Sequence, residues 1–104
     1  MINKKENTIS IELSQQVGGI AVRDARGKTV DREIVSGKYA KDDLMPTIES
    51  VMNELNLRPA DLSLVVVSVG PGGFTGLRTA TTIAKMIAFT TGATVVPVPS
   101  AIVA

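Results

Sequence analysis

Residues 64–78, LVVVSVGPGGFTGLR, decide the fold, because an apolar run passes through a glycine-rich loop into a helical pattern. The valines predict a buried strand, and the residues from Phe74 onward predict a helix. Glycines between them let backbone N–H groups lie exposed at the positive end of the helix dipole. This loop is therefore a candidate phosphate or ligand loop, and its residues are Gly70, Gly72, Gly73, Thr75 and Gly76.

The same glycines have a structural interpretation that competes with ligand binding. No Gly-Lys-Ser/Thr follows the loop, and the Gly-x-Gly-x-x-Gly spacing of a dinucleotide site is missing. Gly72, Gly73 and Gly76 would then serve close packing of the helix on the strand. Spacing alone favours this interpretation.

Three strands are predicted before this stretch. Residues 8–14 alternate between apolar and polar, which is typical of a half-buried strand. Gly18 and Gly19 are expected to interrupt the strand structure, and residues 20–24 are predicted to form a second strand. A turn at Gly27 leads into a third strand over residues 28–36. The three strands should form an antiparallel meander.

A first helix is predicted from Leu44, with Asp42 and Asp43 as its N-cap and Pro46 in its first turn. Pro59 prevents the helix from continuing. Helical spacing predicts one buried face, composed of Leu44, Ile48, Val51, Met52 and Leu55.

Residues 62–69 show no alternation, so we expect a strand covered on both faces at the centre of the sheet. A second helix over residues 74–91 ends at Gly92, and residues 94–98 form the last strand. Strand, helix and strand make a right-handed crossover. The predicted fold is α/β, with a mixed five-stranded sheet: an antiparallel meander followed by a β-α-β crossover.

Composition narrows the possible functions. The chain has 104 residues, which suits one domain, and its formal net charge of +1 comes from dispersed charges. Direct binding to nucleic acid is therefore not expected, and no apolar run is long enough to span a membrane. The chain contains no histidine and no cysteine. We accordingly predict no catalytic residue, no metal site and no cofactor, and a cytoplasmic location.

The glycine loop, residues 8–14, Leu44-Met45-Pro46 and residues 80–85 together resemble the bacterial TsaB (YeaZ) family, which assists threonylcarbamoyladenosine formation on tRNA. The resemblance covers most of the chain from about Thr8. It implies half of an actin-like, sugar-kinase-like (ribonuclease H-like) fold. Residues 1–104 would form a single TsaB-like N-terminal subdomain, and the second subdomain of the family would be absent.

Two positions depart from the family pattern. Residues 11–14 read Ile-Glu-Leu-Ser where the family more usually has Ile-Asp-Thr-Ser, and Ala40 matches a position where the family often has histidine. Glu12 is interpreted as a solvated carboxylate at the end of a strand. The hydroxyls of Ser14, Ser68, Thr75 and Ser100 have no evident activating base, so peptidase activity is not expected.

The second helix has a face that is unusual for contact with solvent, because it mixes Met and Phe with cations and threonine. This face is predicted to be an interface, composed of Arg78, Thr82, Lys85, Met86 and Phe89. Another part of the same subunit could cover it instead. The resemblance implies that the first two helices serve self-association, giving a homodimer, and pairing with the catalytic paralogue TsaD.

The leading hypothesis is a non-enzymatic partner or scaffold protein of the tRNA threonylcarbamoyladenosine machinery, which binds itself or a TsaD-like paralogue. The alternative is a nucleotide- or phosphate-binding half domain of the actin-like ATPase type, which uses the glycine loop.

Overall fold

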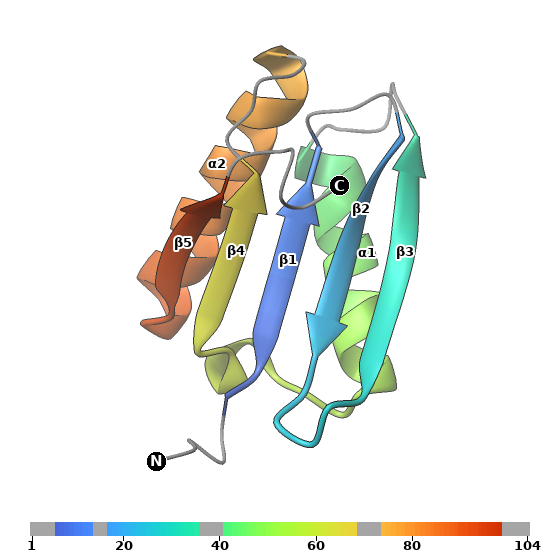
Figure 1. The fold of residues 1–104 in the computed structure, drawn as a ribbon, viewed down its shortest axis with the longest axis vertical. Helices are drawn as coiled ribbons and strands as arrows, with labels where there is room; N and C mark the ends of the chain where they lie inside the picture. The colour runs from blue at the N-terminus through green and yellow to red at the C-terminus, as the bar shows by residue number, and fades with distance from the viewer. Residues whose placement is uncertain (1–5, 14–16, 36–40, 69–73, 99–104) are drawn as a thin grey trace.

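The computed structural model describes residues 6–13, 17–35, 41–68 and 74–98. Within these ranges the chain forms five strands, two α-helices and one short 3-10 helix, η1 (Figure 1). In chain order the elements are β1 (Thr8–Glu12), β2 (Val17–Arg23), β3 (Thr29–Val35), α1 (Lys41–Glu54), η1 (Pro59–Asp61), β4 (Leu64–Ser68), α2 (Phe74–Thr91) and β5 (Thr94–Val98). The predicted bounds of α2 and β5 are confirmed, as is the fold class.

The strands form one sheet in the order β3-β2-β1-β4-β5. β1, β2 and β3 pair antiparallel, whereas β4 runs parallel to both β1 and β5. The predicted meander and crossover are therefore confirmed. The prediction that residues 62–69 form the central strand is wrong, because the parallel pairing places β1 in the middle.

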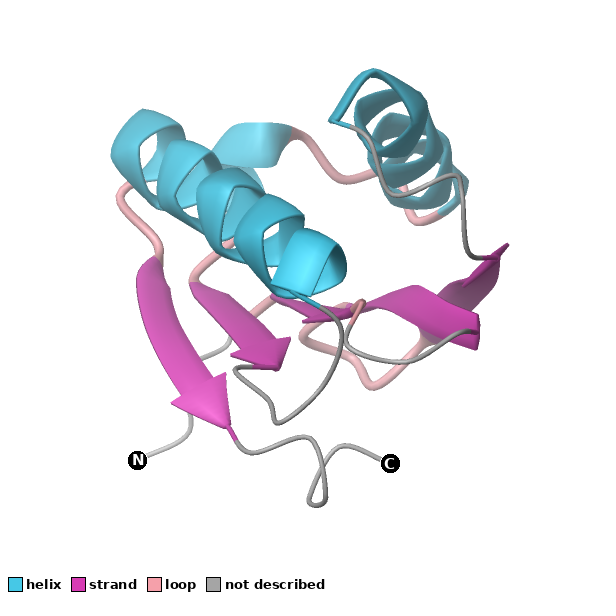
Figure 2. Ribbon diagram, turned by 90° about the horizontal axis from the view of Figure 1, so that it is seen from above, coloured by secondary structure: helices cyan, strands magenta, loops and turns pink. Residues whose placement is uncertain are grey.

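Both α-helices lie on the same face of the sheet (Figure 2). The strands β3, β4 and β5, which follow one another in the chain, also follow one another in one direction across the sheet, and all three are parallel. Because crossovers between parallel strands are right-handed, both connections place their helix on the same side. The prediction that both faces of β4 are covered is therefore wrong. Val65 and Val67 are buried, while Leu64 and Val66 on the other face are only half-buried.

The core lies between this sheet and the two helices. All five apolar residues predicted for the inner face of the first helix are buried, and so are the inner residues Ala80, Ile83, Ala84 and Ile87 of α2. Buried side chains of the sheet face them, among them Ile9 and Ile11 of β1, Ile20 and Val22 of β2, Ile34 of β3, and Val65 and Val67 of β4. Burial of each large side chain contributes about 1.5–3 kcal/mol before conformational entropy is subtracted.

Gly18 and Gly19 were expected to interrupt the strand structure, but both lie within β2. A Cβ on Gly18 would lie 2.2 Å from the backbone oxygen of Glu12. Glycine is therefore required at this position for close approach of two strands, not for a turn. The predicted turn lies at Gly27, whose φ of 92° suits glycine.

The start of α1 also differs from the prediction. The helix begins at Lys41, so Asp42 and Asp43 lie in its first turn instead of at the N-cap, and Pro46 lies inside the helix. The helix ends at Glu54, and Asn56 follows it with a φ of 56°, while the N–H of Leu57 donates to the carbonyl of Met52 at 2.9 Å. This is a Schellman ending with asparagine in the left-handed position.

A buried asparagine ties three segments together at one end of the sheet. The Nδ2 of Asn7 donates to the carbonyl of Asp61, and its Oδ1 accepts from the N–H of Ala25, both at 2.8 Å. In the adjoining turn, burial raises the pKa of Asp24. The N–H groups of Lys28 and Arg26 and the Arg26 guanidinium outweigh that effect, so the pKa lies below its ordinary value.

Within the part of the chain that the structure describes, neither α-helix combines the length and apolar character needed to cross a membrane.

Candidate functional site: a groove between two helices

The outer face of α2 carries an exposed stripe. Arg78, Thr82, Lys85 and Phe89 follow one another at intervals of three or four residues, which places them on one side of the helix, and all four are exposed. Phe89 is 93% exposed. Within the described ranges the only other exposed large hydrophobic residue is Val96, at 37%. In the isolated chain the apolar ring of Phe89 is in contact with water, which is unfavourable. Covering the ring with another molecule would remove this contact.

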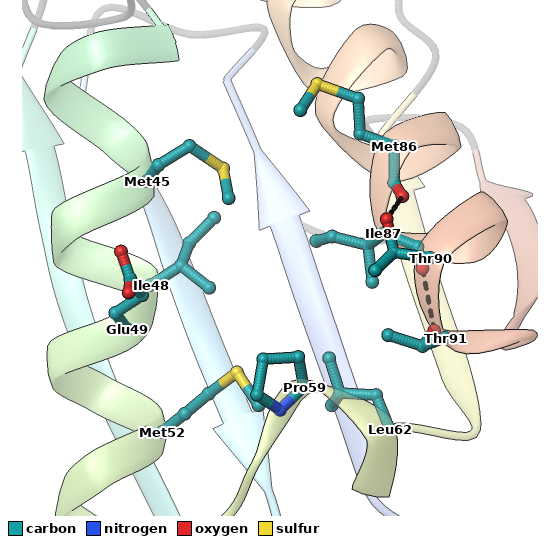
Figure 3. A pocket seen from close by; sticks show the side chains of 10 residues that line it. All are labelled: Met45, Ile48, Glu49, Met52, Pro59, Leu62, Met86, Ile87, Thr90 and Thr91. Carbon is teal, nitrogen blue, oxygen red and sulfur yellow. Dashed lines mark hydrogen bonds between the residues drawn. The ribbon is translucent and has the colours of Figure 1, made fainter.

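Beside this stripe, α1 and α2 enclose a groove of about 270 Å³ (Figure 3). The groove lies above the sheet, and η1 and the residue that follows it reach its lower end. The residues that line the groove belong to α1, to η1 and the residue after it, and to α2. They are Met45, Ile48, Glu49, Met52, Pro59, Leu62, Met86, Ile87, Thr90 and Thr91.

The α1 side of the groove follows from helical spacing. Met45, Ile48 and Met52 are separated by three and four residues, so their side chains stand above one another and point toward α2 (Figure 3). Ile48 and Met52 are buried, and Met45 is half-buried. Methionine side chains are flexible and polarizable, so such a wall can adapt to an apolar group that enters the groove.

The α2 side is apolar although it contains two threonines. The Oγ1 of Thr90 donates to the carbonyl of Met86 at 2.8 Å, and the Oγ1 of Thr91 donates to the carbonyl of Ile87 at 2.7 Å. Both hydroxyls are thus satisfied within their own helix. The groove therefore suits an apolar side chain better than a polar ligand.

The two helices carry opposite charge. α1 contains one lysine and four carboxylates, of which Glu49 is exposed beside the groove, whereas α2 contains Arg78 and Lys85 and no carboxylate. Glu49 and Lys85 form no salt bridge with each other within the described residues. The charges of this face are therefore available to a partner.

The free edges of the sheet are poor places for another strand to pair. The N–H of Thr94 donates to the carbonyl of Ser63 at 3.0 Å, so by strand alternation Pro97 turns its nitrogen toward the open edge of β5. Proline offers no N–H there. On the opposite edge, β3 exposes Asp31, Arg32 and Glu33, and such charges discourage edge pairing.

The structure places the predicted interface residues as follows. Arg78, Thr82, Lys85 and Phe89 form the exposed stripe, and Met86 is half-buried at the groove. Whether they contact a partner stays a prediction. The α1 side of the groove was not predicted, since Ile48 and Met52 were assigned to the core alone. Methionines at matching places on two neighbouring helices were the signal that could have found it.

The candidate ligand loop falls mainly outside the described residues. Gly70, Gly72 and Gly73 lie there, while Thr75 and Gly76 lie in the first turn of α2. A ligand role for these five residues stays a prediction. Ser14, Ala40 and Ser100 also lie outside the described residues, and no group of three or more residues able to hold a metal ion occurs within the described ranges.

Glu12 differs from its predicted solvated state. It is half-buried at the end of β1, and its Oε2 is shielded from solvent. The reason is its central strand position, where the sheet register pairs it with Gly19 of β2.

Comparisons with known proteins agree with this architecture. Residues 33–104 match the family model TsaD, described as tRNA N6-adenosine threonylcarbamoyltransferase. The chain is 36% identical over 85 residues to the tRNA threonylcarbamoyladenosine biosynthesis protein TsaB of Bacillus subtilis (strain 168), which covers 78% of this chain and 35% of that protein.

Two solved structures share the fold at 20% identity, each over 90% of this chain and 43% of theirs. They are YeaZ from Pseudomonas aeruginosa, with a TM-score of 0.80, and an uncharacterized protein with similarity to peptidase YEAZ from Pseudomonas aeruginosa, with a TM-score of 0.82. The present chain thus spans less than half the length of these relatives.

The sheet order and the two helices on one face define half of an actin-like, ribonuclease H-like α/β fold. Within that class, the chain belongs to the TsaB (YeaZ) family, and its match to the TsaD model fits the fold that the two families share.

Proposed function

We propose that this chain is a non-catalytic, protein-binding component of tRNA threonylcarbamoyladenosine biosynthesis, which binds a TsaD-like paralogue through the outer face of α1 and α2. The pathway is the one named for the related TsaB protein, and the exposed residues of α2 beside an apolar groove support the choice of this face. The observation that carries it is that a 93% exposed phenylalanine and an apolar groove lie on the same face.

Physical chemistry favours a protein partner for this face. Interface centres are enriched in aromatic residues, methionine and arginine, and charged residues tend to lie at their rim. Here Met45, Met52 and Met86 line the groove and Phe89 is exposed on α2, while Arg78, Lys85 and Glu49 are exposed on the same two helices. A small polar substrate would find few convergent hydrogen-bonding groups in the groove.

A non-catalytic role is supported by the residues available. The sequence contains no histidine and no cysteine, which removes the commonest general base and the most reactive nucleophile. The hydroxyl of Ser68, one of the serines weighed from the sequence, lies on a residue with no exposed surface.

Isothermal titration of this chain with the TsaD-like protein of the same organism tests the proposal. We expect saturable 1:1 binding in the micromolar range or tighter without added nucleotide, because the apolar face needs no small ligand to form. Titration of the chain with ATP alone serves as the comparison. Nucleotide binding together with no binding to the TsaD-like protein would contradict the proposal and favour the phosphate-binding alternative.

A further inference from the structure

We propose that Met45 and Met86 form a site of reversible oxidation by hydrogen peroxide, and that a sulfoxide at either residue closes the groove between α1 and α2 to apolar groups. The proposal rests on the proposed function for the identity of the partner that would be excluded. It adds a modification site and its consequence, because the oxidised chain would bind that partner more weakly than the reduced chain.

The methionines of this chain are concentrated around one groove. The sequence contains four, and the three that follow Met1, namely Met45, Met52 and Met86, all line the groove. Met45 and Met86 stand on opposite walls, and both side chains point toward the groove (Figure 3). Both residues are half-buried, whereas Met52 is only 3% exposed. An oxidant in solution therefore reaches Met45 and Met86 before it reaches Met52.

The reaction requires only peroxide and a thioether. The sulfur attacks one peroxide oxygen, an S–O bond forms as the O–O bond breaks, and the proton of the transferred oxygen leaves with the departing hydroxide as water. The sulfur loses two electrons, which the peroxide gains, and the product is methionine sulfoxide. Methionine sulfoxide reductases reverse the oxidation. The chain contains no cysteine, so no thiol of its own competes for the peroxide.

A sulfoxide changes which groups the groove accepts. Its oxygen needs a hydrogen-bond donor, but the hydroxyls of Thr90 and Thr91 already donate within their own helix, at 2.8 and 2.7 Å. The other lining side chains are apolar, apart from the carboxylate of Glu49. In the free chain water solvates the new oxygen. An apolar partner surface would displace that water and leave the oxygen unpaired, so oxidation weakens binding more than folding.

Peptide mapping of the isolated chain by mass spectrometry tests whether the fold selects these two residues. After brief exposure to dilute hydrogen peroxide, the sulfoxide fraction at Met45 and Met86 should be on the order of ten times that at Met52. Equal oxidation at all three residues would overturn the assignment, because burial would then not distinguish them.

Isothermal titration with the TsaD-like protein tests the consequence. The chain is oxidised alone and freed of peroxide before mixing, so that the partner is not modified. Its affinity should fall about tenfold or more, and treatment with methionine sulfoxide reductases A and B should restore it. An oxidised chain that binds as tightly as the reduced chain would overturn the proposal.

Leucine variants identify the residues responsible. The double variant Met45→Leu/Met86→Leu nearly conserves volume, so it should bind within about threefold of wild type and keep its affinity after peroxide treatment. Met52→Leu is the matched control and should stay as sensitive to peroxide as the wild type. A double variant that still loses affinity on oxidation would contradict the assignment. Circular dichroism melting checks that each oxidised or substituted chain is folded.

A fluorescent dye separates this proposal from the proposed function. Anilinonaphthalene sulfonate binds exposed apolar surface, and oxidation should weaken its binding about threefold or more in the wild type but not in Met45→Leu/Met86→Leu. If the reduced chain fails to bind the TsaD-like protein, the proposed function is wrong, and the dye still decides whether oxidation closes the groove. Dye binding that is unchanged by oxidation of the wild type would overturn the present proposal.

Discussion

Replacing Gly18 with alanine should destabilise the fold by about 3 kcal/mol. The added Cβ would lie 2.2 Å from the backbone oxygen of Glu12 and 3.2 Å from the Cα of Leu13. These are backbone atoms at the end of the central strand, so β1 and β2 must separate to admit the methyl group. Since a domain of this size is stable by roughly 5–15 kcal/mol, the melting temperature should fall by about 10–20 °C.

The neighbouring glycine supplies a matched control. A Cβ on Gly19 meets only the backbone oxygen of Arg32, at 3.3 Å, so Gly19→Ala should cost about 1 kcal/mol or less. Urea unfolding of both variants and the wild type measures the difference. Equal stability of Gly18→Ala and the wild type would show that the strands do not approach as closely as described.

Replacing Phe89 with aspartate should lower the affinity for the TsaD-like protein about a hundredfold or more. The change removes the largest exposed apolar side chain among the residues of α2 whose exposure the structure describes, and it would bury a carboxylate without a partner in the interface. The free energy of unfolding of the isolated chain should hardly change, because a side chain that is 93% exposed contributes little to the core.

Val96→Asp is the control for this prediction. Val96 is the other exposed large hydrophobic residue in the described part of the chain, and it lies on the sheet face opposite the helices. Its replacement introduces the same charge but should leave the affinity within about threefold of wild type. If Val96→Asp reduces binding as much as Phe89→Asp does, the partner contacts the sheet and not the helices.

Local pattern predicts most of the elements. Period-two alternation in residues 8–14 predicted β1, and the spacing of Leu44, Ile48 and Leu55 predicted the buried face of α1. Gly27 and Gly92 both have positive φ at the predicted stops. These features depend on a few neighbouring residues, which the sequence shows directly.

Sheet order and cover depend on residues far apart in sequence. The valines of β4 have the same pattern whether one or two faces are covered, so Leu64 and Val66 gave no sign of their exposure. Gly18 looked like the end of a strand, because the reason that glycine is needed there is the close approach of Glu12 on another strand. The groove was missed for a similar reason: helical spacing predicts which residues face inward, but not how far α1 and α2 stand apart.

Hydrogen–deuterium exchange of this chain, alone and with the TsaD-like protein, tests most directly whether the outer face of α1 and α2 is the binding surface. The free chain should be measured at a concentration where it does not self-associate. We predict slower exchange in α1 and in the second half of α2 on complex formation, with β2, β3 and β5 unchanged. Protection confined to the strands, or no change in either helix at saturating partner, would contradict the account.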